Sequence, residues 1–204
     1  MPRMGITHVV AIVLTWTAAG GQPPAERQAM LQEVDAIWRT HGVSIVALGP
    51  ERMVAPPSAD ARLTVELART PRPAPAPGTR ERLGAIVFDH DNVPATTLTI
   101  DVAAVTAIVT RVRLGGRLFD QWPPAWRDTL VGRALGRVMA HEIGHYLLAS
   151  RVHTSEGLMR AAFDGDELLR PGRAGFAVPA RDLPRLRTRL AGLGGASSLA
   201  ENAR

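Results

Sequence analysis

The chain has 204 residues, of which 46% are hydrophobic and 21% charged, so it can form one globular domain with a substantial core. This balance excludes a wholly disordered, collagen-like or coiled-coil protein. Because the chain has no cysteine, it cannot form disulfides, iron–sulfur clusters or thiolate zinc sites, and it has no cysteine nucleophile. Any transition-metal site must therefore use His, Asp and Glu.

The formal net charge is +5, and all 24 basic residues are arginines because the chain contains no lysine. The missing lysine excludes a lysine Schiff base and a P-loop lysine. Arginine at every basic position is typical of coding bias, so we expect no nucleic-acid partner. A basic nucleic-acid binder is an alternative that rests on the arginine excess alone.

The first 21 residues are typical of a secretory signal peptide. Arg3 precedes an apolar stretch over residues 6–19, and small residues follow through Gly21. The stretch is too short to span a bilayer comfortably, which takes roughly 20 residues. We therefore expect cleavage near residues 19–21 and a secreted or periplasmic protein without stable membrane insertion. A buried first strand or a retained anchor is the alternative.

The next part of the chain alternates between helical and strand patterns. Helical spacing of apolar residues predicts a helix over 24–40, and strict alternation predicts a half-buried strand over 62–69. The proline-rich segment 71–78 predicts an extended surface loop. Short apolar runs predict three further strands and a helix, over 43–48, 83–88, 98–102 and 102–112.

A long helix is predicted over 124–149, because Pro124 can occupy its first turn and apolar residues cover nearly all its sides. Gly132 and Gly136 fall on one side of it, where we expect close packing against a sheet. A leucine stripe predicts a last helix over 182–193. We expect one domain over residues 22–193 and a flexible tail over 194–204.

Residues 141–145 of the long helix read His-Glu-Ile-Gly-His. Positions i and i+4 lie one above the other on a helix, so His141 and His145 can bind one Zn²⁺. Glu142 is rotated by about 100° from His141 and suits a general base beside the metal. The pattern arises by chance in roughly one such chain in a hundred. The alternative is two core histidines hydrogen-bonded to neighbours, but burying them with Glu142 is costly without a metal.

A catalytic zinc needs a third protein ligand and an open fourth position. His153 is the best candidate, because a chain that leaves the helix near Ser150 can fold back far enough to bring its imidazole to the metal. Carboxylates further along the chain compete for the same role: Glu156, Asp164, Asp166 and Glu167.

Residues 141–159, HEIGHYLLASRVHTSEGLM, resemble the active-site stretch of metzincin metallopeptidases, above all the matrixin branch. The resemblance implies that His141, His145 and His153 are the metal ligands and that Glu142 is the general base. It implies that Met159, in a Met-turn over 157–159, forms an apolar floor beneath the metal. It also implies a zincin-like α+β fold: a small mixed sheet packed on the long active-site helix, plus a C-terminal helix.

The stretch departs from the metzincin pattern in three ways. His153 follows His145 by eight residues instead of six, and Leu148 stands where metzincins have a helix-breaking glycine. Arg160 follows a shortened Met-turn where some relatives carry tyrosine, and we expect it to be exposed. The one tyrosine, Tyr146, is expected in the core. The segment AHEIGHYLL also resembles the helix of intracellular metallopeptidases that cleave phage-type repressors, whose third ligand is acidic.

These observations predict an exported, zinc-dependent metalloendopeptidase that acts on a peptide or protein substrate. In this hypothesis Glu142 takes a proton from the zinc-bound water and passes it to the leaving amine. An edge strand such as residues 83–88 can align an extended peptide. The alternatives are a zincin-fold domain that binds metal or a partner without catalysis, and a repressor-cleaving type of peptidase with an acidic third ligand.

Overall fold

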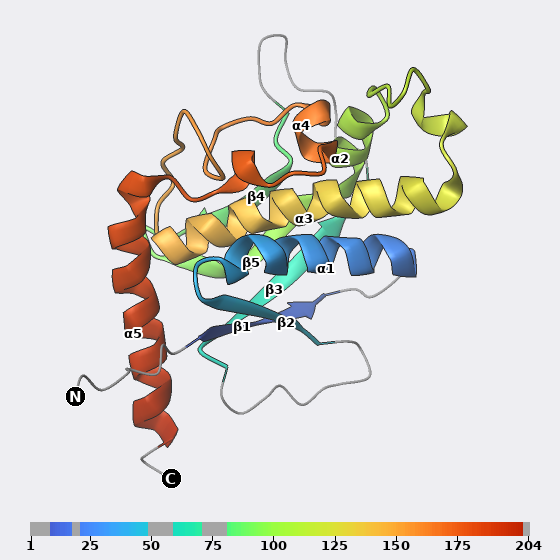
Figure 1. The fold of residues 1–204 in the computed structure, drawn as a ribbon. Helices are drawn as coiled ribbons and strands as arrows, with labels where there is room; N and C mark the ends of the chain where they lie inside the picture. The colour runs from blue at the N-terminus through green and yellow to red at the C-terminus, as the bar shows by residue number, and fades with distance from the viewer. Residues whose placement is uncertain (1–8, 18–20, 49–58, 71–80, 202–204) are drawn as a thin grey trace, which may run out of the picture.

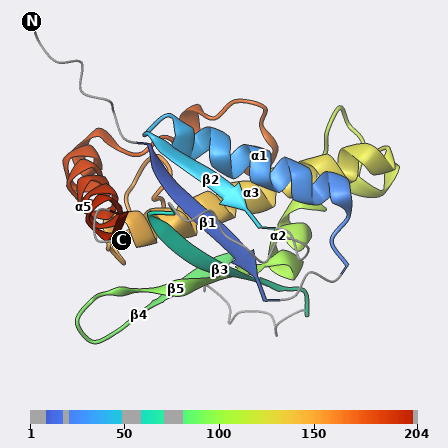
Figure 2. The same cartoon turned by 90° about the horizontal axis from the view of Figure 1, so that it is seen from below.

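The computed structural model describes residues 9–17, 21–48, 59–70 and 81–201, and these form a mixed α+β structure. A five-stranded sheet lies on one side, and the helices α1 and α3 lie side by side across one of its faces (Figures 1 and 2). The elements follow in the order β1 (Val10–Trp16), α1 (Pro24–Arg39), β2 (Val43–Ala47), β3 (Ala61–Ala68), β4 (Gly84–Phe88), β5 (Pro94–Asp101), α2 (Val102–Val109), α3 (Pro124–Leu148), α4 (Gly165–Leu169) and α5 (Leu183–Glu201).

The strands are arranged in the order β2-β1-β3-β5-β4. The first four of these are parallel to one another, and β4 is antiparallel to β5 at the edge of the sheet. Parallel strands need crossover connections, and α1 supplies the one between β1 and β2. The second edge of β4 therefore has no strand partner among the described residues, and β4 contacts the long helix α3.

The segment that we expected to be the apolar part of a signal peptide forms β1. Ile12, Val13 and Leu14 are fully buried there, and β1 pairs with β2 on one side and with β3 on the other. Cleavage near residues 19–21 would remove this strand and separate β2 from β3. The structure of the full chain therefore has a buried first strand, our alternative for this segment, and cleavage near residues 19–21 stays a prediction. Secretion or a periplasmic location stays a prediction.

The two glycines of α3 approach α1 rather than the sheet, so the prediction that they pack on a sheet is wrong. A Cβ added to Gly132 would lie 2.2 Å from the carbonyl oxygen of Glu26, and one added to Gly136 would lie 2.6 Å from that of Met30. The two helices therefore touch backbone to backbone at these positions. On the sheet, α1 contacts β2, whereas α3 contacts β4 and β5.

Most predicted elements are present with shifted ends. β5 begins at Pro94, four residues before the predicted strand, and α2 ends at Val109. α5 continues to Glu201, eight residues beyond the predicted end of the last helix and into the expected tail. The predicted loop over 71–78 lies outside the described residues. Within the described part of the chain, no helix is long and apolar enough to cross a membrane.

Buried charges fix the C-terminal part of the chain to the helical layer. The fully buried Arg137 of α3 donates from Nε to Glu33 Oε1 of α1 at 2.8 Å, and from its Nη atoms to the carbonyl oxygens of Glu167 and Gly172. Arg173 donates to the second oxygen of the same Glu33 carboxylate at 2.7 Å. Because a buried charge without partners is costly, this network holds the segment around α4 in one position.

Candidate metal centre

Besides Arg137, the C-terminal half of α3 carries three buried residues with imidazole or carboxyl side chains, all within the HEIGH segment. His141, Glu142 and His145 expose only 7%, 5% and 5% of their surfaces. Trp38 of α1 supports this part of α3, because its Nε1 donates to the carbonyl oxygen of Ala140 at 3.2 Å. Tyr146 is also buried, as expected for a core residue.

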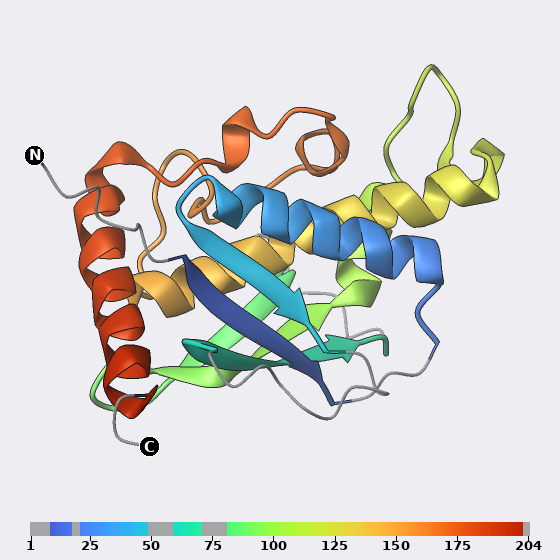
Figure 3. The same ribbon diagram turned by 60° about the horizontal axis from the view of Figure 1, so that its bottom comes forward.

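The helix ends at Leu148 without the glycine that metzincins have. Ala149 takes a left-handed conformation with φ 42° and ψ 50°, which costs a residue with a Cβ roughly 1 kcal/mol. The amide of Ser150 donates to the carbonyl oxygen of His145 at 3.2 Å, and Arg185 of α5 donates to the carbonyl oxygen of Ala149 at 2.7 Å. Figure 3 shows α5 passing this end of α3. The chain therefore reverses here and brings the following loop back toward the helix.

This loop returns His153 to the two helical histidines. The ring of His153 stacks on that of His141, with centroids 5.2 Å apart and an interplanar angle of 13°. It lies edge-on to His145 at 4.9 Å. One nitrogen from each of the three rings lies within 4.8 Å of the others, and His153 is the exposed member of the group. The three predicted ligands are thus brought together, and this cluster could hold a metal ion.

The hydrogen bonds of the two buried rings set their tautomers. Nδ1 of His141 lies 2.7 Å from the carbonyl oxygen of Leu158, and Nδ1 of His145 lies 2.6 Å from that of Ser150. A carbonyl oxygen only accepts, so each Nδ1 must donate and each Nε2 carries a lone pair in the neutral ring. The two Nε2 atoms nevertheless face each other at 3.0 Å.

Two lone pairs at this distance repel unless a cation lies between them. Zn–N bonds of about 2.0–2.1 Å in a tetrahedral site place two ligand nitrogens roughly 3.3 Å apart. The observed 3.0 Å separation is close to that value. The two Nε2 atoms, with each Nδ1 held by a carbonyl oxygen, therefore fit a bound metal ion. The same arrangement fits two ordinary core histidines poorly.

Burial also favours the metal-binding form of the imidazoles. It lowers the pKa of His141 to about 3, with a smaller contribution from the neighbouring His145. Burial likewise lowers the pKa values of His145 and His153. The rings are therefore neutral at physiological pH, which is the state in which imidazole binds metals.

Met159 is buried against α3, next to Gly144 of the HEIGH segment. It exposes 1% of its surface, and a Cβ added to Gly144 would lie 2.4 Å from its sulfur. The loop is closed by the amide of Thr154, which donates to the carbonyl oxygen of Met159 at 2.8 Å. Gly157 lies in this loop at φ 70°. A Cβ added to it would lie 2.4 Å from the carbonyl oxygen of Ala177. The glycine inside HEIGH thus makes room for the methionine.

The side chain of Glu142 lies against β4. A Cβ added to Gly84, the first residue of β4, would lie 2.7 Å from Glu142 Oε1 and 2.9 Å from its Cγ. Burial raises the pKa of Glu142 to about 8, although the positive charge of Arg82 opposes the shift. The sequence interpretation missed Gly84, although a glycine inside a strand pattern is a known signal of close approach by another group.

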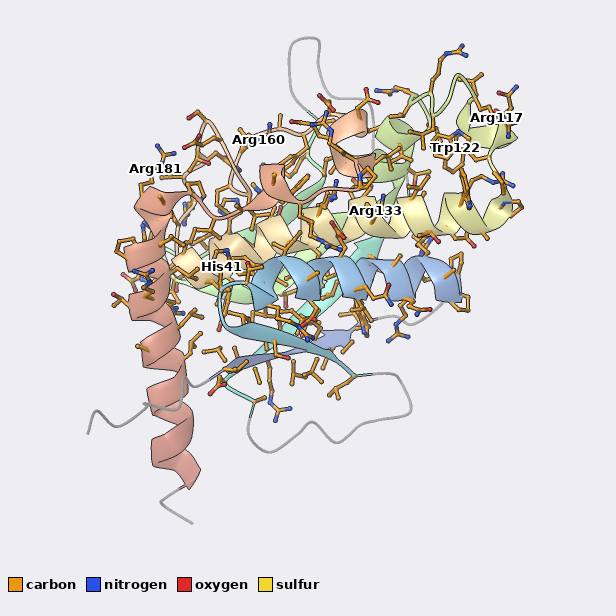
Figure 4. All side chains as sticks on the ribbon, viewed as in Figure 1. His41, Arg117, Trp122, Arg133, Arg160 and Arg181 are labelled. Carbon is orange, nitrogen blue, oxygen red and sulfur yellow. The ribbon has the colours of Figure 1, made fainter. Side chains whose placement is uncertain are left out.

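A pocket of about 770 Å³ opens over the cluster. Its walls are β4, the three histidines with Glu142, and the segment 160–163 that follows the Met-turn. Arg160, labelled in Figure 4, is half-buried here because its Nη1 donates to Glu167 Oε1 at 2.8 Å. The expectation that Arg160 is simply exposed is therefore wrong.

The competing carboxylates do not join the cluster. In the described part of the chain the group that could hold a metal consists of the three histidines alone. Asp164 caps α4 by accepting from the amide of Glu167, and Glu167 is occupied by Arg160. Comparison of the chain with protein-family models, curated proteins and solved structures finds no match.

Proposed function

We propose that this protein is a zinc-dependent metalloendopeptidase with a zincin-like fold of the metzincin type. The observation that carries the proposal is the convergence of His141, His145 and His153 beside the buried carboxyl of Glu142 in an open pocket. The burial of Met159 against the HEIGH segment gives further support, and so does the edge of β4 that has no strand partner among the described residues. Nitrogen ligands from three histidines suit zinc among the common protein metals.

When bound, zinc supplies Lewis acidity, which acidifies water and polarises a peptide carbonyl. The chain's own contribution to the reaction is the carboxyl of Glu142. This group accepts a proton from the attacking water and releases it to the leaving amine. Its burial beside Gly84 fixes it in place and strengthens its electrostatic interactions. The carbonyl partners of His141 and His145 hold the two rings in the ligand orientation.

The substrate in this proposal is an extended peptide that lies along β4. One edge of β4 pairs with β5, and its residues line the pocket. A peptide can bind such a free edge by main-chain hydrogen bonds, which place alternate side chains toward the pocket. In this proposal the peptide runs along β4 so that an internal peptide bond lies over the histidine cluster.

The test is metal content and peptide cleavage in the wild type, Glu142→Ala, His153→Ala and Glu156→Ala. Glu142→Ala should keep its zinc and lose about 10²- to 10⁴-fold in kcat, the contribution typical of a general base. His153→Ala should lose zinc. Glu156→Ala, an exposed carboxylate in the same loop, is the control and should behave as the wild type. Full activity in Glu142→Ala would refute the mechanism.

A second candidate is a metal-binding domain without catalysis. It is favoured by the position of Tyr146, which is buried against α5 with Arg189 over its ring and does not line the pocket. No tyrosine hydroxyl is therefore available to stabilise an oxyanion. This candidate predicts one zinc per chain, no cleavage of a broad peptide library, and no difference between Glu142→Ala and the wild type.

A further inference from the structure

The walls of the pocket carry more positive than negative charge. Of the described residues that line it, Arg82, Arg151 and Arg160 are basic, whereas Glu81 is the one carboxylate besides Glu142. The charge of Arg160 is neutralised by its ion pair with Glu167. Among the described residues, Arg82 and Arg151 form no ion pair. Two guanidinium groups therefore remain free to bind an anionic group.

These two arginines lie at the two ends of β4. Arg82 stands two residues before the first residue of the strand, Gly84. The guanidinium of Arg151 lies over the ring of Phe88, the last residue of β4, with 5.1 Å between its Cζ and the ring centroid. A strand of five residues is about 13 Å long at ~3.3 Å per residue. An extended peptide segment of the same length would meet one arginine at each end.

The position of Arg151 is fixed without loss of its charge. Its Nη2 donates to the carbonyl oxygen of Asp89 at 2.8 Å, which orients the guanidinium but does not neutralise it. The Asp89 carboxylate is used elsewhere, because its Oδ1 accepts from the amides of Asp91 and Val93 in the turn after β4. The remaining donors of Arg151 are therefore available to a ligand.

We propose that the pocket selects peptides that carry Asp or Glu side chains at the ends of the segment lying along β4, bound by Arg82 and Arg151. This inference rests on the proposed function for its substrate class. Arginine binds carboxylates through a planar fork of donors. A pocket lined by one sign of charge also concentrates ligands of the opposite sign. The pocket disfavours peptides with arginine or lysine at the same positions.

The experiment compares matched peptides that have Glu or Gln at the two end positions. We measure kcat/KM with the zinc-loaded wild type, and Kd by fluorescence anisotropy with zinc-loaded Glu142→Ala. We expect a preference of about fivefold for each Glu, which corresponds to ~1 kcal/mol at 1.4 kcal/mol per tenfold change. Because the arginines are partly solvated, the preference should shrink between 50 and 500 mM salt.

Three variants test the assignment to particular residues. Arg82→Gln and Arg151→Gln should each reduce the Glu-to-Gln ratio toward one. Arg117→Gln removes an exposed arginine near the opposite, N-terminal end of α3 (Figure 4), and it should leave the ratio unchanged. A ratio of one in the wild type, or a ratio that neither pocket variant changes, overturns the proposal.

Two further outcomes separate this inference from the proposed function. If no peptide is cleaved but anisotropy shows an arginine-dependent preference for Glu, the peptidase proposal fails and the acidic binding site stands. If peptides are cleaved without any preference, the peptidase proposal stands and this inference fails. Each peptide is measured with a free and with an amidated C-terminus. A preference that disappears on amidation would assign the arginines to a terminal carboxylate and overturn the side-chain assignment.

Discussion

Gly84→Ala tests whether β4 positions Glu142, the proposed general base. The added Cβ would lie 2.7 Å from Glu142 Oε1, whereas ordinary contacts begin at 3.4 Å, so the carboxyl must move by at least about 0.7 Å. Misplacement of a reacting group by about 1 Å can lower the rate by about 10². We therefore expect kcat to fall by about 10- to 100-fold, with one zinc per chain retained.

The assay is steady-state cleavage of one peptide by Gly84→Ala, with zinc content and the urea midpoint measured on the same preparations. Gly192→Ala is the matched control, because an added Cβ meets nothing within 4 Å there. Glu142→Asp retracts the carboxyl, so the further loss caused by Gly84→Ala should be smaller in that background. A Gly84→Ala protein with wild-type kcat, or one whose loss is the same in both backgrounds, would refute the reasoning.

Three other predictions concern stability. Deletion of residues 1–21 should prevent cooperative thermal unfolding, because it removes the strand between β2 and β3. A truncated chain with native circular dichroism and a sharp transition would contradict this prediction and support the signal-peptide interpretation. Gly136→Ala should lower the free energy of unfolding by roughly 1–3 kcal/mol, as overpacking does, because the added Cβ would lie 2.6 Å from the carbonyl oxygen of Met30. Urea titration of this variant beside the control Gly192→Ala checks the prediction. Equal urea midpoints for the two variants would contradict it. In the metal-free protein, burial raises the pKa of Glu142 from 4.5 to about 8, so its contribution to stability is present below pH 4.5 and is lost as the pH rises to 8. Relative to Glu142→Gln, the wild type should therefore lose up to ~1.4 kcal/mol of unfolding free energy per pH unit in this window; a difference between the two that does not vary with pH would exclude the shift.

Local patterns predicted much of this structure. The strand over 62–69 and the helices over 24–40 and 124–149 are observed within a residue or two of the predicted ends, because hydrophobic periodicity reports which side of an element is buried. The same patterns misplaced the start of β5 and the end of α5. Pro94 opens a strand at the edge pairing with Phe88, and this pairing is invisible to a local window.

The first strand shows the limit of local patterns most clearly. A short apolar run after one basic residue is typical both of a signal peptide and of a strand buried on both faces. Partners decide between them, and the partners of residues 10–14 are residues 43–47, far along the chain.

For the metal centre, residue spacing was enough to place His141, Glu142 and His145, because a helix brings positions i and i+4 together whatever surrounds it. His153 could be nominated from the resemblance, but its approach depends on the left-handed turn at Ala149 and on the contact of that turn with α5. The closeness of Gly84 to Glu142, and the arginines at the two ends of β4, depend on how a distant strand packs against α3. The sequence by itself therefore determined the pair of histidines, the carboxylate and the helix that carries them, since these follow from backbone geometry within one turn. The approach of His153, the wall against Glu142 and the charge of the pocket were decided by tertiary structure, since they depend on contacts between residues tens of positions apart.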